Sequence, residues 1–216
     1  MLQHYKGQLG EFDYNTDDYD LINDFGDDCL HYKGETLKLN LPKGITSTRG
    51  MFEGCRLPEG FTFGDFNTEN VTDMTNMFRL CQMPVSFTLG NQFDTTSVQK
   101  MSGMFMGCTM SDDFSLGDKF DTSKVASMGA MFEFCVMSDS FTFGEYFNTK
   151  NVVNMNHMFY DTEIRNKDLL RNQFDTSNVE TMWGMFEDCT MPDGFTLGEC
   201  FDTSKVKTMS GMFNNC

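Results

Sequence analysis

The sequence predicts an α/β repeat solenoid in which every coil adds one short parallel strand and one short helix. The first observation is a Met-Phe pair that recurs along the chain, at residues 51, 77, 104, 131, 158, 185 and 212. The spacing is 26 residues once and 27 residues thereafter. A fixed period of this length is typical of one unit that is copied and stacked, because a single unit cannot bury its apolar face alone.

The second observation is that methionine and phenylalanine occupy fixed columns of this repeat. Of the 19 methionines, all but Met1 and Met106 fall in three columns, and most of the 23 phenylalanines also fall in columns. Methionine fills irregular gaps between coils, and phenylalanine supplies a large buried area. We therefore expect these columns to form the core, and we predict no cofactor or metal bound through them.

A helix is predicted in each coil between its valine and its cysteine. In the third copy the apolar residues are Val98, Met101, Met104, Phe105 and Cys108, and this spacing is typical of one helix face. The preceding F-D-T-S, as at residues 120–123, supplies side-chain oxygens that can accept hydrogen bonds from the first helical turn. We interpret it as a turn followed by an N-cap.

A strand of three or four residues is predicted in the other half of each coil. The runs Phe-Thr-Leu-Gly at 87–90 and 195–198 alternate apolar and polar residues and stop at glycine. Residues 37–39, Leu-Lys-Leu, are expected to form the first strand of the stack.

Two regions follow from the repeat: an acidic N-terminal cap at 1–35 and a solenoid of about seven coils at 36–216. Alternating stretches at 19–25 and 29–32 are candidate cap strands. Asp13, Asn15 and Asp17 resemble the start of a calcium loop, but Asp18 stands where glycine is required, and Asp24 stands where a glutamate is required. A solvated acidic loop is favoured there, and no metal site is predicted.

Six of the eight cysteines lie four residues after the column methionine, and Thr162 takes this place in the fifth copy. They could form disulfides or an internal ladder of thiols. Because threonine is also a small hydrogen-bond donor, its presence favours the ladder. Cys200 lies in a loop column and is expected to be the most exposed thiol.

Charge and motifs limit the function. A net charge of −16 disfavours binding to nucleic acid. The chain has no nucleophile elbow, phosphate-binding glycine loop or H-E-x-x-H motif, so we predict that it is not an enzyme. His157 is noted because its column otherwise holds small or polar residues.

The run F-D-T-S-N-V-E-T-M-W-G-M-F-E-D-C at 174–189 resembles the bacterial surface-protein 26-residue repeat, a BspA-like branch of the leucine-rich repeats. The resemblance covers about residues 36–216. It implies a leucine-rich-repeat-like solenoid, a form often found on extracellular or surface proteins thought to bind other molecules. It does not imply one ligand.

The sequence gives conflicting indications of localisation. The resemblance implies the cell surface or secretion, but residues 1–20 show neither a basic n-region nor an apolar h-region. The absent signal and the expected free cysteines favour the cytoplasm. No run of about 18 apolar residues exists, so no membrane insertion is predicted.

The fifth copy departs most from the repeat. It places Asp168 where the others have a core phenylalanine, and Leu169 and Arg171 replace the strand threonine and the terminal glycine. Two interpretations remain: drift in one tolerated coil, or a partner-binding patch. The patch would consist of Tyr160, Arg165, Lys167, Arg171 and the out-of-column Trp183.

Three function classes are compatible with the sequence. The first is a non-catalytic recognition or adhesion scaffold for a protein or glycan. The second is an assembly subunit that forms homo-oligomers through an uncapped C-terminal coil. The third is ice binding, suggested by an outward column of hydroxyl residues that Leu169 interrupts: Thr62, Thr88, Ser115, Thr142 and Thr196.

Overall fold

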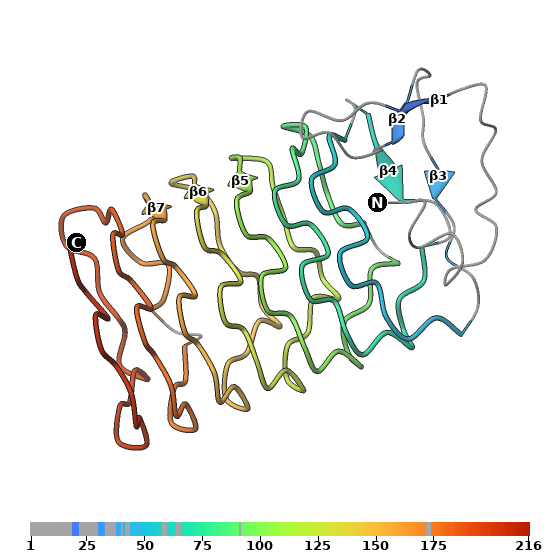
Figure 1. Cartoon of the computed structure of the whole chain (residues 1–216). Helices are drawn as coiled ribbons and strands as arrows, with labels where there is room; N and C mark the ends of the chain where they lie inside the picture. Colours follow the sequence, from blue (N-terminus) through green and yellow to red (C-terminus); the bar gives the residue numbers. More distant parts are fainter. Residues whose placement is uncertain are drawn as a thin grey trace.

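The structure is a computed structural model in which the repeats form coils that lie side by side in one row (Figure 1). It describes residues 44–216 except 58–59, 64–65, 91 and 172–173, and before residue 44 only 19–21, 30–32, 38–39 and 41. Backbone bridges pair equivalent residues of successive coils in parallel, for example Asp73 with Lys100 and Lys100 with Ser127. The stacking that the period predicts is therefore the observed arrangement.

All strands in the described part are short, and they form three small sheets. Strands β1 (Tyr19–Leu21) and β2 (Leu30–Tyr32) pair antiparallel, in the two stretches predicted as cap strands. Strands β3 (Lys38–Leu39) and β4 (Thr62–Phe63) pair in parallel, so the first predicted strand of the stack is confirmed. Most of the predicted acidic cap, including the candidate calcium loop, lies outside the described residues.

The predicted α/β architecture is wrong, because no helix occurs in the part of the chain that the structure describes. The segments between the valine and cysteine columns are successions of turns instead. No helix long and apolar enough to cross a membrane occurs among these residues either.

Backbone hydrogen bonds show why these segments are not helical. The N–H groups of Gly50, Phe52 and Gly54 donate to carbonyls of the next coil, at 2.7–2.9 Å. The N–H groups between them bond within the coil to a carbonyl only three residues earlier, as from Glu53 to Gly50 at 3.1 Å. An α-helix needs bonds over four residues, all within one segment. Here alternate donors join neighbouring coils, so the spacing of three that suggested a helix arises from consecutive turns.

Left-handed residues make these turns possible. Each of these turn segments has two of them, one before the Met-Phe pair and one four residues later, as at Gly103 (φ 64°) and Gly107 (φ 74°). Because glycine has no Cβ, it adopts this conformation without steric cost. The glycines at these places indicate turns, and they argue against the helix that the apolar spacing suggested.

The strands also lie elsewhere in the coil than predicted. Strands β5 (Thr109–Met110), β6 (Val136–Met137) and β7 (Glu163–Ile164) form a parallel sheet just after the cysteine column. The predicted strand at 87–90 is reduced to one bridge, between Thr88 and Ser115. Its alternation is nevertheless confirmed, because Phe87 and Leu89 are buried and Thr88 is exposed.

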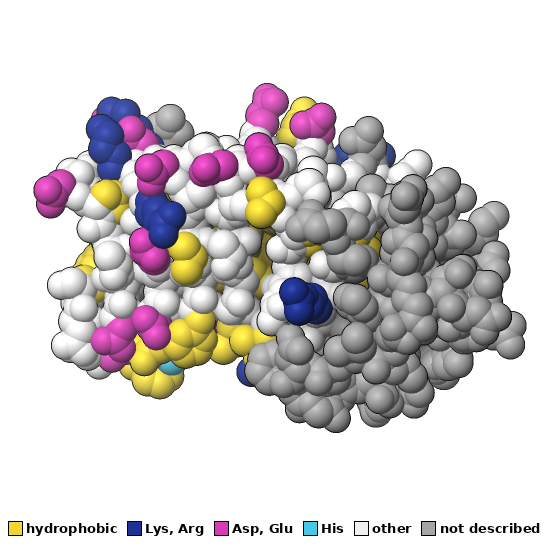
Figure 2. Space-filling view, turned by 90° about the horizontal axis from the view of Figure 1, so that it is seen from above, with side chains coloured by type: hydrophobic (Ala, Val, Ile, Leu, Met, Phe, Trp, Pro, Cys, Tyr) yellow, Lys and Arg dark blue, Asp and Glu magenta, His cyan; other side chains and the backbone are white. Residues whose placement is uncertain are grey.

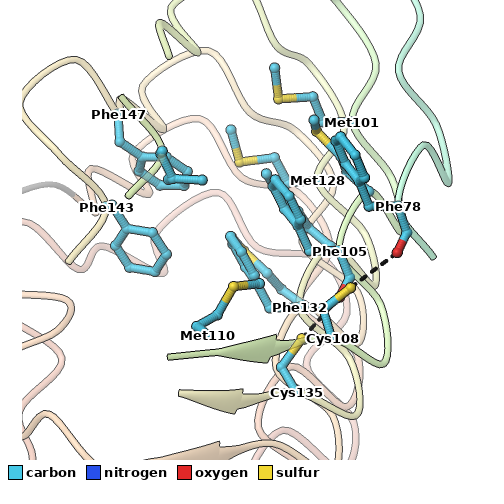
Figure 3. Packing of buried hydrophobic residues seen from close by; sticks show 14 of the residues in the cluster. Phe78, Met101, Phe105, Cys108, Met110, Met128, Phe132, Cys135, Phe143 and Phe147 are labelled. Carbon is cyan, nitrogen blue, oxygen red and sulfur yellow. Dashed lines mark hydrogen bonds between the residues drawn. The ribbon is translucent and has the colours of Figure 1, made fainter. Parts of the chain in front are cut away.

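The core is a stack of phenylalanine rings that continues from coil to coil. Within it, Phe105 lies between Phe78 and Phe132, with centroid distances of 5.6 and 5.8 Å and interplanar angles of 2° and 7° (Figure 3). The methionine columns pack around these rings and are fully buried through most of the stack. The prediction that the Met and Phe columns form the core is confirmed.

A ladder of thiols runs beside the ring stack. The Cys108 thiol donates to the carbonyl of Phe78 at 3.0 Å, and the Cys135 thiol donates to that of Phe105 at 3.1 Å (Figure 3). The Thr162 hydroxyl makes the corresponding bond to Phe132 at 2.6 Å. Threonine therefore replaces cysteine as a donor of similar size, as the ladder interpretation requires.

The F-D-T-S segment forms a turn but caps no helix. The Asp121 carboxylate accepts a hydrogen bond from the Ser123 N–H at 2.7 Å, which closes the turn. The buried Thr122 hydroxyl instead donates to the carbonyl of Asn148 in the next coil, at 2.7 Å. The predicted turn is thus present, and the threonine joins coils.

Candidate partner-binding surface

Four aromatic side chains from three neighbouring coils form one row on the turn segments: Phe134, His157, Tyr160 and Trp183. We call this row the aromatic surface. Its ring centroids are 5.5 Å apart for Phe134 and Tyr160, 5.3 Å for Tyr160 and His157, and 4.4 Å for His157 and Trp183. The side chains of Trp183 and Phe134 are 50% and 44% exposed. Figure 2 shows hydrophobic side chains gathered with a histidine along one edge of the molecule.

Bonds between coils hold this row in place. The Trp183 N–H donates to the side-chain oxygen of Asn156 at 2.9 Å, and the Trp183 carbonyl accepts from the His157 N–H at 2.9 Å. The Phe134 N–H donates to the Tyr160 carbonyl at 2.8 Å. The rings therefore project from backbone that is fixed on both sides by neighbouring coils, so presenting them costs little entropy.

Two of the four residues occupy left-handed positions where some other coils have glycine. Phe134 has φ of 58° and His157 has φ of 55°. Bulky residues in this conformation are strained by about 1–3 kcal/mol each, and such strain clusters at functional sites. Space for the imidazole comes from Gly184, where a Cβ would lie 2.5 Å from His157 Cδ2.

Carboxylates surround the aromatic surface. The Tyr160 hydroxyl donates to Asp188, and this bond, together with the Glu187 and Asp161 charges, raises the tyrosine pKa. Burial raises the pKa of Glu133, against the opposing influence of His157 and Arg79. The Glu187 carboxylate lies beside the imidazole, since both would meet a Cβ at residue 184 within 2.9 Å. The local potential is therefore negative.

The structure brings only part of the predicted patch together. Tyr160 and Trp183 belong to the aromatic surface, and the predicted exposure of Trp183 is confirmed. The three cations lie on the loop after β7, and they pair with carboxylates of their own coil. The distances are 2.8 Å from Arg165 to Glu163, 3.4 Å from Arg171 to Asp168 and 3.8 Å from Lys167 to Asp168.

The two parts also have separate electrostatic neighbours. Arg165 is influenced by Glu163, Asp139 and Asp112. None of these carboxylates is among those that act on Tyr160. The cations therefore form an ion-paired loop of their own, and the carboxylates of the aromatic surface are left without them.

The irregular fifth coil still buries apolar side chains, although its core-column residue, Asp168, is polar. Leu169 stands in the outward column yet is buried, next to the buried Leu170. Asp168 is turned toward the surface, where it meets Lys167 and Arg171. The hydroxyl column of Thr88, Ser115, Thr142 and Thr196 is exposed, and Leu169 interrupts it. The side chain of Thr62 lies outside the described residues.

Other candidate chemistry is sparse in the described part. Among these residues, no group of three or more His, Cys, Asp or Glu side chains is placed to hold a metal ion. The predicted exposure of Cys200 is confirmed, and Cys216 is exposed as well. The predicted patch does not include Phe134, although this residue lies outside every phenylalanine column, and a departure from a column is also what distinguishes Trp183.

Comparison with known proteins identifies a family without a known activity. No curated protein and no solved structure matches the chain. A family profile matches residues 31–140 and again residues 115–216, consistent with the repeated coils. The chain belongs to the family described as Mycoplasma protein of unknown function, DUF285.

Proposed function

We propose that the chain is a non-catalytic recognition scaffold that presents the aromatic surface to a protein or glycan partner. The observation that carries the proposal is the row of four rings, of which Phe134 and the single tryptophan of the chain, Trp183, are exposed. Tryptophan and tyrosine are among the residues most enriched at binding hot spots. Rings held on rigid backbone anchor an interface at low entropic cost.

The resemblance of the repeat unit to BspA-like surface-protein repeats supports the same proposal. Members of that family are associated with binding at cell surfaces, and the resemblance rests on residues 174–189 and their copies. The corrected fold does not remove this support, because the stacked coils still form an extended and rigid face.

Capture with variants tests the proposal. Immobilised wild-type protein and Trp183→Ala are each exposed to solubilised cell-surface proteins and to a panel of glycans. Any captured partner is then purified, and its affinity for both proteins is measured. We expect Trp183→Ala to weaken binding about tenfold or more, as for a hot-spot residue. The matched control is Val85→Ala, which truncates another exposed apolar side chain outside the aromatic surface.

A partner that binds Trp183→Ala and wild type equally would place recognition elsewhere on the molecule. Equal melting temperatures of the three proteins would show that lost binding is not lost folding. We expect nearly equal values, because substitutions of exposed side chains usually change stability by less than about 0.5 kcal/mol.

A second candidate function is self-association through the coil at 206–216. In this coil Phe213 is 48% exposed, whereas the equivalent Phe186 is fully buried. The Phe186 N–H donates to Met212, but among the described hydrogen bonds none is donated by the Phe213 N–H. The Phe213 ring and backbone N–H are thus the groups that a second copy would contact.

Light scattering at several protein concentrations tests the second candidate. We expect a dimer that Phe213→Glu dissociates, because a charge would be buried in the interface. The control is Val85→Glu, at an exposed position in a distant coil. A wild-type monomer at every concentration would contradict this candidate.

A further inference from the structure

We propose that the aromatic surface receives a cationic side chain, an arginine or lysine, from a basic segment of a protein partner. The inference rests on the proposed function and specifies the chemistry of the partner. It is carried by the geometry of the rings and by the carboxylates around them.

Ring orientation favours a cation over a sugar. The interplanar angle is 90° between Phe134 and Tyr160, 64° between His157 and Tyr160, and 48° between His157 and Trp183. A sugar ring stacks best on a flat aromatic platform, which rings at these angles do not form. The exposed Trp183 ring can instead attract a compact cation, because the electron density of an aromatic face is attractive to positive charge.

The charges around the rings favour the same occupant. Glu133, Asp161, Glu187 and Asp188 lie on the turn segments that carry the aromatic surface. Glu187 and Asp188 accept hydrogen bonds from Asn214 and Asn215, at 2.8 and 3.0 Å, but these neutral amides leave the negative charge in place. The raised pKa of Tyr160, which follows from its hydrogen bond to Asp188 and from the nearby carboxylate charges, agrees with an excess of negative charge here.

In the described part, Arg79 acts on Glu133 but is not among the groups that act on Tyr160. The cations of the fifth coil are paired on a separate loop, and Arg79 pairs with Glu53. The whole molecule has a net charge of −16, which would steer a basic segment toward it. Charge complementarity therefore selects a basic protein segment.

The single Trp183 provides a direct reporter, because its fluorescence comes from within the aromatic surface. The probes are a short acetylated peptide of alternating glycine and arginine, its citrulline counterpart, and a neutral chito-oligosaccharide. Citrulline has nearly the shape of arginine but no charge. We expect the arginine peptide to change the Trp183 emission with an affinity at least about tenfold higher than that of the citrulline peptide or the sugar.

Paired acid substitutions separate this site from general attraction to an acidic protein. The test variant is Glu133→Gln with Asp188→Asn, and asparagine suits the left-handed backbone at residue 188. The control variant, Asp193→Asn with Glu199→Gln, removes the same charge from exposed positions. We expect the test pair to weaken arginine-peptide binding about tenfold and the control pair to have less than a twofold effect.

The possible outcomes decide between the proposals. Equal binding of the arginine and citrulline peptides, equal loss in both double variants, or no binding of either peptide would overturn the inference. Binding of the sugar alone would also overturn it, while leaving the proposed recognition function intact. Failure of the recognition function itself would appear in the capture assay, as partners that do not distinguish Trp183→Ala from wild type.

Discussion

Phe105 represents the residues that hold the coils together. Its ring is fully buried between Phe78 and Phe132, and it also meets Phe114 edge-on at a centroid distance of 5.9 Å. Phe105→Ala should lower the free energy of unfolding by about 3–5 kcal/mol. The truncation leaves a cavity between stacked coils, and these coils cannot move independently to fill it. Urea denaturation measures this change. The same substitution at the exposed Phe134 should cost less than about 1 kcal/mol, and equal losses would show that the stack is not the main source of stability.

The thiol ladder predicts an order of chemical reactivity. Burial raises the pKa of Cys135 and of Cys189 to about 12, and the reactive species is the thiolate. In the native protein, iodoacetamide should therefore label the exposed Cys200 first and the buried thiols only after unfolding. Mass spectrometry of timed samples gives the order. Fast labelling of Cys135 in the folded state, or a disulfide between column cysteines, would contradict the ladder.

At the scale of the element, the turn segments should respond to glycine by position. Ala130 has φ of 57°, which costs an alanine about 1–2 kcal/mol, whereas glycine adopts it freely. After subtraction of the extra entropy that glycine loses on folding, Ala130→Gly should stabilise the protein by about 0.5–1 kcal/mol. Ala126→Gly, at an exposed position without a left-handed backbone, should destabilise it by a similar amount. Thermal unfolding of both variants checks the sign, and two changes of the same sign would contradict the turn geometry.

The same segments show why the sequence predicted the stack and the core but not the elements. Residues such as Met101, Met104 and Phe105 are buried whether a coil is built from a helix or from turns, so their columns identify the core in either case. Their spacing of three is shared by both forms. What distinguishes turns is the pairing of left-handed residues such as Gly103 and Gly107, which a helix would place at unfavourable interior positions.

The candidate site could be predicted only in part for a related reason. Trp183 was identified as exposed because it interrupts a column of small residues, and that inference holds in either kind of coil. The neighbours of Trp183 depend on how the coils stack. His157 lies one coil earlier in the sequence, yet its ring is 4.4 Å from that of Trp183. The apparent association of Trp183 with Arg165 came from distance along the chain and not from the fold.

At the scale of the whole molecule, acid pH acts on stability in two opposite directions. With a net charge of −16 and a pI near 4.4, the folded chain repels itself less as the pH falls from 7 toward 5. Against this, the turns depend on ionised carboxylates. Hydrogen bonds from Ser177 and Ser204 lower the pKa values of Asp175 and Asp202 below their ordinary value of 3.8. These carboxylates stabilise the fold above that pH, and their contribution is lost as the pH falls through the lowered values.

The melting temperature should therefore hold or rise between pH 7 and about 5, and should fall below about 3.8 as these turns are protonated. The chain offers its own control, because Asn148 fills the same column and accepts the equivalent bond, from Lys150, at 2.8 Å. Asp175→Asn with Asp202→Asn should keep the turns and reduce the loss at low pH. The control variant, Asp193→Asn with Glu199→Gln, removes the same number of negative charges outside these turns. It should leave the acid transition unchanged. Calorimetry from pH 7 to pH 2.5 compares the wild type with the two double variants. If both variants shift the acid transition equally, the effect comes from the overall charge and not from the turns.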